Sequence, residues 1–344
     1  MATEFPEGVL ATSPSQQRPA IGKAPFKMPA YFPILVSTIA LVIISALISP
    51  RTMSPISLSA MLPFAAILAV AAVGQTLVVQ QRGIDLSVGG TISLAAVLVA
   101  AGPVKHQIPT LLMVVIVLLV CAVVGWVNSL LVTRLMITPL VATLAINAVL
   151  VGVVLLYTGG STAATPDGLS NFVSFKILGA PTLLWLSILL VIILAVVASK
   201  TVFGRQFVLS GANPATAITN GIKVERNVVL AYVLAAVCYG VAGIFLAGYL
   251  QNVTASAGNS YLMSVIAVVI VGGTPLTGGR GTIIGTAIAA LFMSQLIQLV
   301  LTLGAPTATQ MLIQAIAISV AAILGAVRGG KNKRKKSAKS KAAA

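Results

Sequence analysis

Ten apolar runs, each of about 20 residues, constrain this chain more than any other feature of its sequence. A helix of that length crosses a bilayer, and its backbone satisfies its own hydrogen bonds there. The sequence therefore predicts an all-α polytopic membrane protein with about ten transmembrane helices, two of them short or broken by glycine. The clear runs cover 31–49, 58–79, 108–132, 139–158, 183–199, 228–250, 282–303 and 309–327, and the two weaker runs cover 83–102 and 261–277.

The composition supports this class and defines two polar tails. Only 8% of the 344 residues are charged, whereas soluble domains carry about 25%. We expect a disordered cytoplasmic N-terminal tail at 1–29, a transmembrane domain at 30–327 and a basic cytoplasmic tail at 328–344. The net charge of +16 is interpreted as a topology signal and a contact with anionic lipid, not as a nucleic-acid site.

The lysines and arginines sort to one side of the predicted membrane. With the N-terminus in the cytoplasm, 18 of the 21 lie on the cytoplasmic side, and only Arg51, Lys105 and Lys176 lie outside. Positive charge is enriched in cytoplasmic loops of membrane proteins. The sequence therefore predicts a multi-pass protein of the plasma membrane with both termini in the cytoplasm.

The longest internal cytoplasmic loop, 200–227, contains the segment NPATAITNG at 213–221. Asn213 is a good N-cap residue, Pro214 suits the first helical position, and Gly221 suits the residue after the helix. The sequence therefore predicts a short, water-facing helix between two membrane spans.

Only one of the five acidic residues, Asp85, falls in a predicted membrane segment. Two interpretations stay open. Asp85 caps the third span by accepting a hydrogen bond from the amide of Ser87 or Val88, or it is a polar group on a translocation path or gate.

Glycine interrupts the chain in GIDLSVGG (83–90) and in VGGTPLTGGRG (271–281). Broken helices at membrane depth line cavities or pack on protein, and small residues also allow helices to pack closely. Both interpretations can hold together.

Motifs of catalysis and metal binding are missing from the sequence. It has no GxxxxGK[ST], HExxH or CxxC segment, and its single histidine is His106. The two cysteines, Cys121 and Cys238, fall inside apolar runs and are interpreted as packing residues. We expect no catalytic residue, no metal site and no cofactor bound by this chain.

Four motifs together resemble the permease subunit of ribose-type bacterial ABC sugar importers. They occur in order across most of residues 31–327. The motifs are GQTLVVQQRGIDLSVGG (74–90), GWVNSLLVTRLMITPLVATLAINAVLVGV (125–153), GRQFVLSGANPATAITNGIKVERNVVLAYVLAAVCYGVAGIFLAG (204–248) and IAVVIVGGTPLTGGRGTIIGTAIAALF (266–292).

The resemblance implies that the chain carries a monosaccharide inward, such as a ribose-like pentose, a hexose or a related polyol, across a bacterial inner membrane. The implied partners are a cytoplasmic ATP-binding-cassette subunit that holds ATP and Mg²⁺, an extracytoplasmic sugar-binding protein and a second permease copy or homologue. The implied coupling segment to the ATPase is NPATAITNG with the next residue: Asn213, Pro214, Ala215, Ala217, Gly221 and Ile222. Candidates for the gate or path are Asp85, Ser87, Gly89, Asn128, Gly272, Gly273, Gly278, Gly279 and Arg280.

The chain also departs from the family pattern. Arg82 stands where the family usually has a glycine, and Leu262 and Ser264 stand where relatives often carry acids, which leaves the sugar open. Alternatives are a permease of the branched-chain amino acid type, an ion-coupled secondary transporter, and a membrane scaffold or intramembrane enzyme. Amides in the spans could bond sugar hydroxyls or hold helices together: Gln75, Asn128, Asn147, Gln295, Gln298, Gln310 and Gln314.

Overall fold

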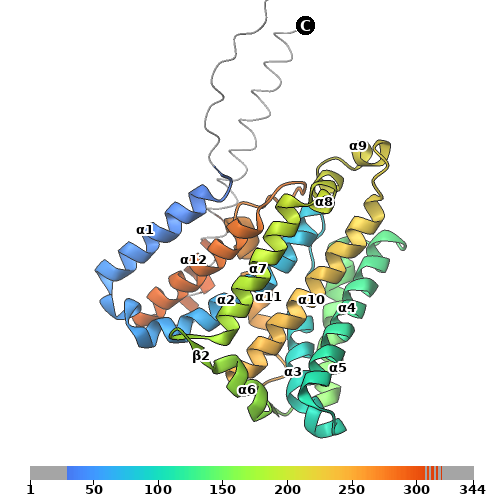
Figure 1. The fold of residues 1–344 in the computed structure, drawn as a ribbon. Helices are drawn as coiled ribbons and strands as arrows, with labels where there is room; N and C mark the ends of the chain where they lie inside the picture. Colours follow the sequence, from blue (N-terminus) through green and yellow to red (C-terminus); the bar gives the residue numbers. More distant parts are fainter. Residues whose placement is uncertain (1–28, 307, 310, 314, 317–318, 320–344) are drawn as a thin grey trace, which may run out of the picture.

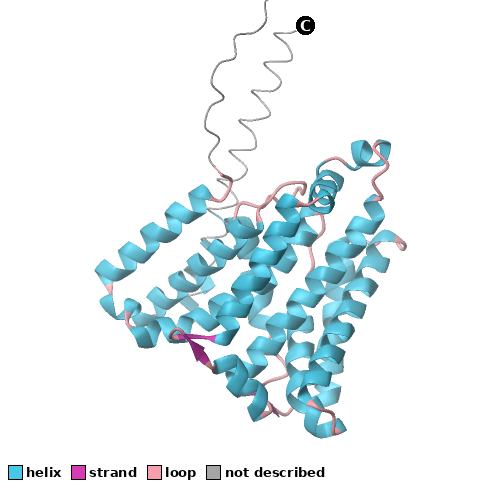
Figure 2. Cartoon of the chain, in the orientation of Figure 1, coloured by secondary structure: helices cyan, strands magenta, loops and turns pink. Residues whose placement is uncertain are grey.

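The computed structural model describes residues 29–306, 308–309, 311–313, 315–316 and 319, and they form a bundle of helices (Figures 1 and 2). The longer helices are α1 (Phe32–Ile48), α2 (Pro55–Gln80), α3 (Val88–His106), α4 (Thr110–Thr133), α5 (Pro139–Thr158), α7 (Thr182–Lys200), α10 (Val224–Leu250), α11 (Asn259–Val271) and α12 (Ile283–Thr302). Shorter ones are η1 (Pro50–Met53), α6 (Asp167–Ser174), α8 (Val202–Ala212) and α9 (Pro214–Thr219).

Two small antiparallel pairs of strands complete the described elements. β1 (Ala163–Ala164) pairs with β4 (Asn252–Val253), and β2 (Lys176–Ile177) pairs with β3 (Ala180–Pro181). The prediction of an all-α polytopic membrane protein is confirmed, because these pairs are short connections beside the helices.

Nine of the ten predicted runs are helices in the described part of the chain. Seven of these helices are long and apolar enough to cross a membrane, while α1 and α11 are shorter. The weak run at 83–102 was expected to be short or broken, but α3 is a full helix of 19 residues that begins at Val88. The tenth run, 309–327, lies largely outside the described residues, as do the two tails.

Three helices form the centre of the bundle, and others surround them. The apolar stretches of α2, α3 and α10 are 61%, 78% and 61% buried, and that of α12, which packs on α2, is 56% buried, against 22–28% for α4, α5 and α7. Small residues bring the central helices together: a Cβ on Gly243 of α10 would lie 2.5 Å from the carbonyl oxygen of Ile92 in α3. The outward faces of α4, α5 and α7 are apolar, as a bilayer requires.

The bundle has two distinct ends. Figure 1 places α8, α9 and the beginning of α1 at one end and α6 and β2 at the other. Arg82 bonds to the end of α8, whereas Lys105 donates to the carbonyl of Tyr157 near the far end of α5. Arg82 and Lys105 thus lie at opposite ends, as predicted, and the orientation of those ends in a membrane stays a prediction.

α11 is a half-helix that begins inside the bundle. After α10 the chain turns at Gln251, pairs β4 with β1 and runs inward, and the amide of Gly258 donates to Ser93 Oγ of α3 at 2.9 Å. The 13 residues of α11 span about 20 Å, whereas a bilayer core is about 30 Å thick. Non-helical residues therefore cross the remaining distance, packed on protein as such segments must be.

Candidate functional site

The helix α9 is fixed at its N-terminus by the predicted cap. The amide of Thr216 donates to Asn213 Oδ1 at 3.2 Å, and Pro214 is the first helical residue. Side-chain caps of this kind satisfy amides that have no partner within the helix. The short helix predicted within 213–221 is present at Pro214–Thr219.

The C-terminus of α9 is fixed by two backbone bonds. Gly221 has a φ of +74°, and its amide donates to the carbonyl of Ile218 at 2.9 Å. The amide of Ile222 donates to the carbonyl of Ala217 at 3.0 Å. This paired pattern is a Schellman motif, which requires a left-handed residue at the glycine position.

One predicted contact residue of α9, Ala217, points into the chain and not toward a partner. Ala217 was expected to press against a partner, but its side chain is fully buried against the rest of the chain. Ala215 is exposed, and the large apolar residue on the outer face is Ile218, which is 64% exposed. Sequence reasoning missed Ile218, although an isolated isoleucine among Ala, Thr and Asn was a signal for an exposed apolar contact.

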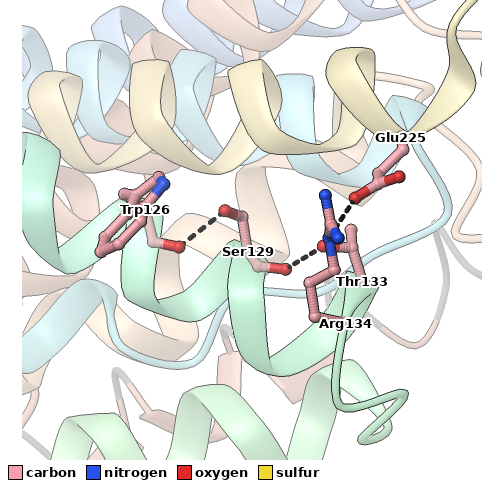
Figure 3. Close-up of polar contacts among 5 residues, drawn as sticks. All are labelled: Trp126, Ser129, Thr133, Arg134 and Glu225. Atoms are coloured by element: carbon pink, nitrogen blue, oxygen red, sulfur yellow. Dashed lines mark hydrogen bonds and ion pairs between the residues drawn. The ribbon is translucent and has the colours of Figure 1, made fainter.

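An open groove of about 600 Å³ lies beside α9 and the beginning of α10. Two of its lining residues form an ion pair: Arg134 Nε, after α4, lies 2.7 Å from Glu225 Oε1, in α10 (Figure 3). Both side chains are more than half exposed, so this pair contributes little to stability. The groove is lined by Arg134, Ile218, Ile222, Lys223, Val224, Glu225, Arg226 and Val229.

Three predicted path residues come together in a buried cluster. Asp85 Oδ1 accepts from the amide of Ser87 at 2.9 Å and from Ser87 Oγ at 2.6 Å. Asn128 Nδ2 of α4 donates to Ser87 Oγ at 2.8 Å. All three side chains have no exposed surface, so they lie inside the chain and not on an open path.

The predicted bond from Ser87 to Asp85 is present, but Asp85 is not the N-cap of α3. The helix begins at Val88 with Ser87 as its N-cap, so Asp85 lies two residues earlier. The side-chain amide of Gln75 is oriented so that it can bond to both Tyr239 and Asp85. In this orientation Gln75 accepts from the backbone amide of Asp85 at 3.1 Å and donates to the backbone carbonyl of Asp85 at 3.2 Å. Asp85 Oδ2 has no partner among the described residues.

The other candidates for the path form separate groups. Gly89 lies beside Gly258 and Asn147, and Gly272 packs on Thr286 of α12. The loop that follows is next to the end of α8: an added Cβ on Gly278 would meet Arg82, and one on Gly279 would meet Ala212. Gly273 and Arg280 are exposed.

The side-chain amides predicted to lie in the spans differ in their burial and in their hydrogen bonds. Asn147 Oδ1 accepts from the amide of Gly90 at 2.8 Å, which holds α5 against α3. Gln75 and Gln295 are buried, Gln298 is half-buried, and Gln310 and Gln314 lie outside the described residues.

The exposed face of α11 differs from those of the outer helices. From Leu140 to Leu156 every exposed residue of α5 is apolar, as lipid requires. On α11 the residues near its beginning that reach the surface are the exposed Asn259, Ser260 and Met263 and the half-buried Ser264. This face is uncharged, and it is polar apart from Met263.

Within the part of the chain that the structure describes, no group of three or more His, Cys, Asp or Glu side chains lies close enough to hold a metal ion. Cys121 and Cys238 are free and buried. Their surroundings fit the packing interpretation.

Comparisons with known proteins agree with the resemblance found in the sequence. A family model described as the permease component of a branched-chain amino acid transport system matches residues 57–322. No solved structure matches the chain.

The curated relatives carry the names of import permeases. The chain is 36% identical over 287 residues to the ribose import permease protein RbsC of Bacillus subtilis, covering 83% of this chain and 89% of the relative. It is 32% identical over 295 residues to RbsC of Escherichia coli, covering 84% and 92%. It is 31% identical over 277 residues to the autoinducer 2 import system permease protein LsrC of Salmonella typhimurium, covering 79% and 78%.

These names fit the sugar importer interpretation better than the amino acid alternative. The chain therefore belongs to this family of transport-system permeases, as a multi-pass membrane subunit similar to the ribose-type permeases of ABC importers.

Proposed function

We propose that this chain carries a ribose-like monosaccharide or related polyol inward, driven by ATP hydrolysis in a separate subunit. The observation that carries the proposal is α9, a helix capped at both ends that presents Ile218 outward beside an open groove. A rigid helix with an exposed apolar anchor suits docking on a partner protein. The named relatives supply the class of substrate.

In this proposal the ATP-binding-cassette subunit docks on α9 and the adjacent groove, at the cytoplasmic end. ATP and Mg²⁺ belong to that subunit, and this chain supplies no catalytic residue. Exposed cations near α9, including Lys223 and Arg226, favour an acidic surface on the ATPase. An extracytoplasmic sugar-binding protein delivers the solute to the opposite end, near α6.

The solute path runs along the polar face of α11 and is completed by a second permease copy or homologue. Asn259, Ser260 and Ser264 supply amide and hydroxyl groups at membrane depth without a charge. Such groups bond sugar hydroxyls, and they fit an uncharged solute better than an ion. The absence of acids at Leu262 and Ser264 also argues against ion coupling on this face.

The test is reconstitution of the chain in proteoliposomes with its ATPase and its binding protein. We expect a monosaccharide such as ribose to stimulate ATP hydrolysis and to accumulate inside, whereas leucine does neither. Leucine uptake without sugar uptake would favour the amino acid alternative. Solute uptake driven by a proton or sodium gradient without ATP would contradict the proposal.

A further inference from the structure

Arg82 occupies an unusual position in the turn that joins α2 to α3. Its φ is +66°, a left-handed conformation that residues other than glycine adopt rarely. A long cationic side chain in this turn therefore needs a compensating contact.

That contact is made with the end of α8. Arg82 Nε donates to the carbonyl of Gly211 at 2.7 Å, and Nη2 donates to the carbonyl of Ala212 at 2.7 Å. Carbonyls at a helix C-terminus carry partial negative charge and have no partner within the helix. The next residue, Asn213, is the N-cap of α9, so the guanidinium is bound immediately before the proposed docking helix.

The surrounding contacts make this junction stiff. Gln81 Nε2 donates to the carbonyl of Phe207 at 2.7 Å, and Ser210 Oγ donates to Gln81 Oε1 at 2.9 Å. A Cβ on Gly211 would lie only 1.8 Å from the carbonyl oxygen of Gln80, so the end of α8 and the last turn of α2 are in direct backbone contact. A displacement of α8 toward α2 would therefore press on the backbone of α2 at this point.

The other side of the same turn reaches the buried cluster. Asp85 follows three residues after Arg82, and both its amide and its carbonyl contact Gln75 of α2. Its carboxylate holds Ser87 at the beginning of α3. The turn 81–87 thus connects the base of α9 with the helix that packs against α11.

We propose that Arg82 is a positioning residue that transmits displacement of α9 to the turn 81–87 and the beginning of α3. The inference rests on the proposed function, because it takes α9 to be the helix that the ATPase moves. Arg82 does not contact the solute in this account. It converts docking of the ATPase into movement beside the path.

The experiment compares three variants in proteoliposomes with the ATPase and the sugar-binding protein. Arg82→Gly removes the guanidinium and suits the left-handed backbone, so the turn keeps its shape. Arg82→Lys keeps the positive charge, but its compact ammonium group does not reproduce the planar guanidinium that bonds two carbonyls at once. Arg205→Gln is the matched control, because Arg205 is an exposed arginine of α8 at the same end.

We expect Arg82→Gly to assemble with the ATPase and to hydrolyse ATP, while uptake of sugar per ATP hydrolysed falls several-fold. Arg82→Lys restores part of this ratio, and Arg205→Gln keeps the wild-type ratio. A purely structural role would lower the thermal midpoint and the yield of complex and leave the ratio unchanged.

An unchanged ratio in Arg82→Gly, whether or not stability falls, would overturn the inference. If Arg82→Gly does not fold, a wild-type ratio in Arg82→Lys would overturn it equally. These outcomes are distinct from failure of the proposed function, which is seen as absence of sugar-stimulated ATP hydrolysis in the wild-type protein.

Discussion

At the scale of single residues, the buried hydrogen bonds of Asp85 show that its role as an acceptor can be separated from its negative charge. Ser87 donates twice to one carboxylate oxygen, while the other oxygen has no partner among the described residues. A neutral amide oxygen can accept the same two bonds. The charge of Asp85 is therefore not needed to hold Ser87, although it is available for a role in the gate.

Asp85→Ala should lower the stability of the purified protein, because it leaves the two donors of Ser87 without their acceptor. The expected cost is about 1–3 kcal/mol, measured as a fall in the thermal midpoint in detergent. Asp85→Asn should keep most of the stability and reduce uptake. Glu7→Ala is the control, because Glu7 lies in the N-terminal tail, outside the predicted spans; wild-type uptake in Asp85→Asn would contradict the gate interpretation.

Gly221 sets the end of α9 through its backbone conformation. Gly221→Val should destabilise that end by about 1–2 kcal/mol, since an L-residue resists the left-handed region. Gly221→Asn should be tolerated, because asparagine adopts this conformation more readily. Co-purification with the ATPase checks this: we expect weaker capture of the valine variant only, and equal capture of both variants would contradict the role of the Schellman motif.

At the scale of elements, α11 has a polar face where the outer helices have apolar ones. Ser264 lies about 10 Å from the C-terminal end of α11, using the helical rise per residue. Ser37 of α1 is the comparison position: it lies near the same end, and its hydroxyl bonds to the carbonyl four residues earlier, as that of Ser264 does. Ser37 is exposed and Ser264 is half-buried, so exposure alone would favour labelling of Ser37. The two serines differ in what surrounds them: Ser37 has exposed Val36 and Ile39 beside it, whereas Ser264 lies beside exposed Met263 and exposed Ser260.

Cysteine labelling in membranes tests the surroundings of α11 directly. Ser264→Cys should react with a hydrophilic thiol reagent, and saturating sugar should slow the reaction, whereas Ser37→Cys should stay unlabelled. The native thiols give little background, because Cys121 and Cys238 are buried. Labelling of Ser264→Cys no faster than that of Ser37→Cys would remove α11 from the path.

Much of the fold could be predicted because its signals are local. An apolar run predicts a span by itself, and the caps Asn213 and Gly221 predict the ends of α9 from single positions. The inward face of Ala217 could not be predicted, because a six-residue helix has too few positions to define an apolar face. The cluster of Asp85 with Asn128 and the inward path of residues 252–258 depend on contacts between distant segments, which have no local signature.

At the scale of the whole molecule, the bundle joins two ends that carry different features. The end with α8 and α9 carries the groove, the ion pair and Arg82, and the opposite end carries α6 and the small strand pairs. Between them, α2, α3 and α10 form a closely packed centre that cannot deform smoothly. A displacement at α9 would therefore move helices as units, which is the behaviour that alternating access needs.

The central claim is that α9 couples ATP hydrolysis to solute movement, and Ile218 tests it most directly. Sugar uptake and ATP hydrolysis are measured together in proteoliposomes with the ATPase and the binding protein, for wild type, Ile218→Asp and Ile218→Met. We predict that Ile218→Asp inserts normally but loses complex formation, stimulated hydrolysis and uptake, whereas Ile218→Met retains them because it keeps an apolar anchor. Wild-type uptake and hydrolysis in Ile218→Asp would contradict the account.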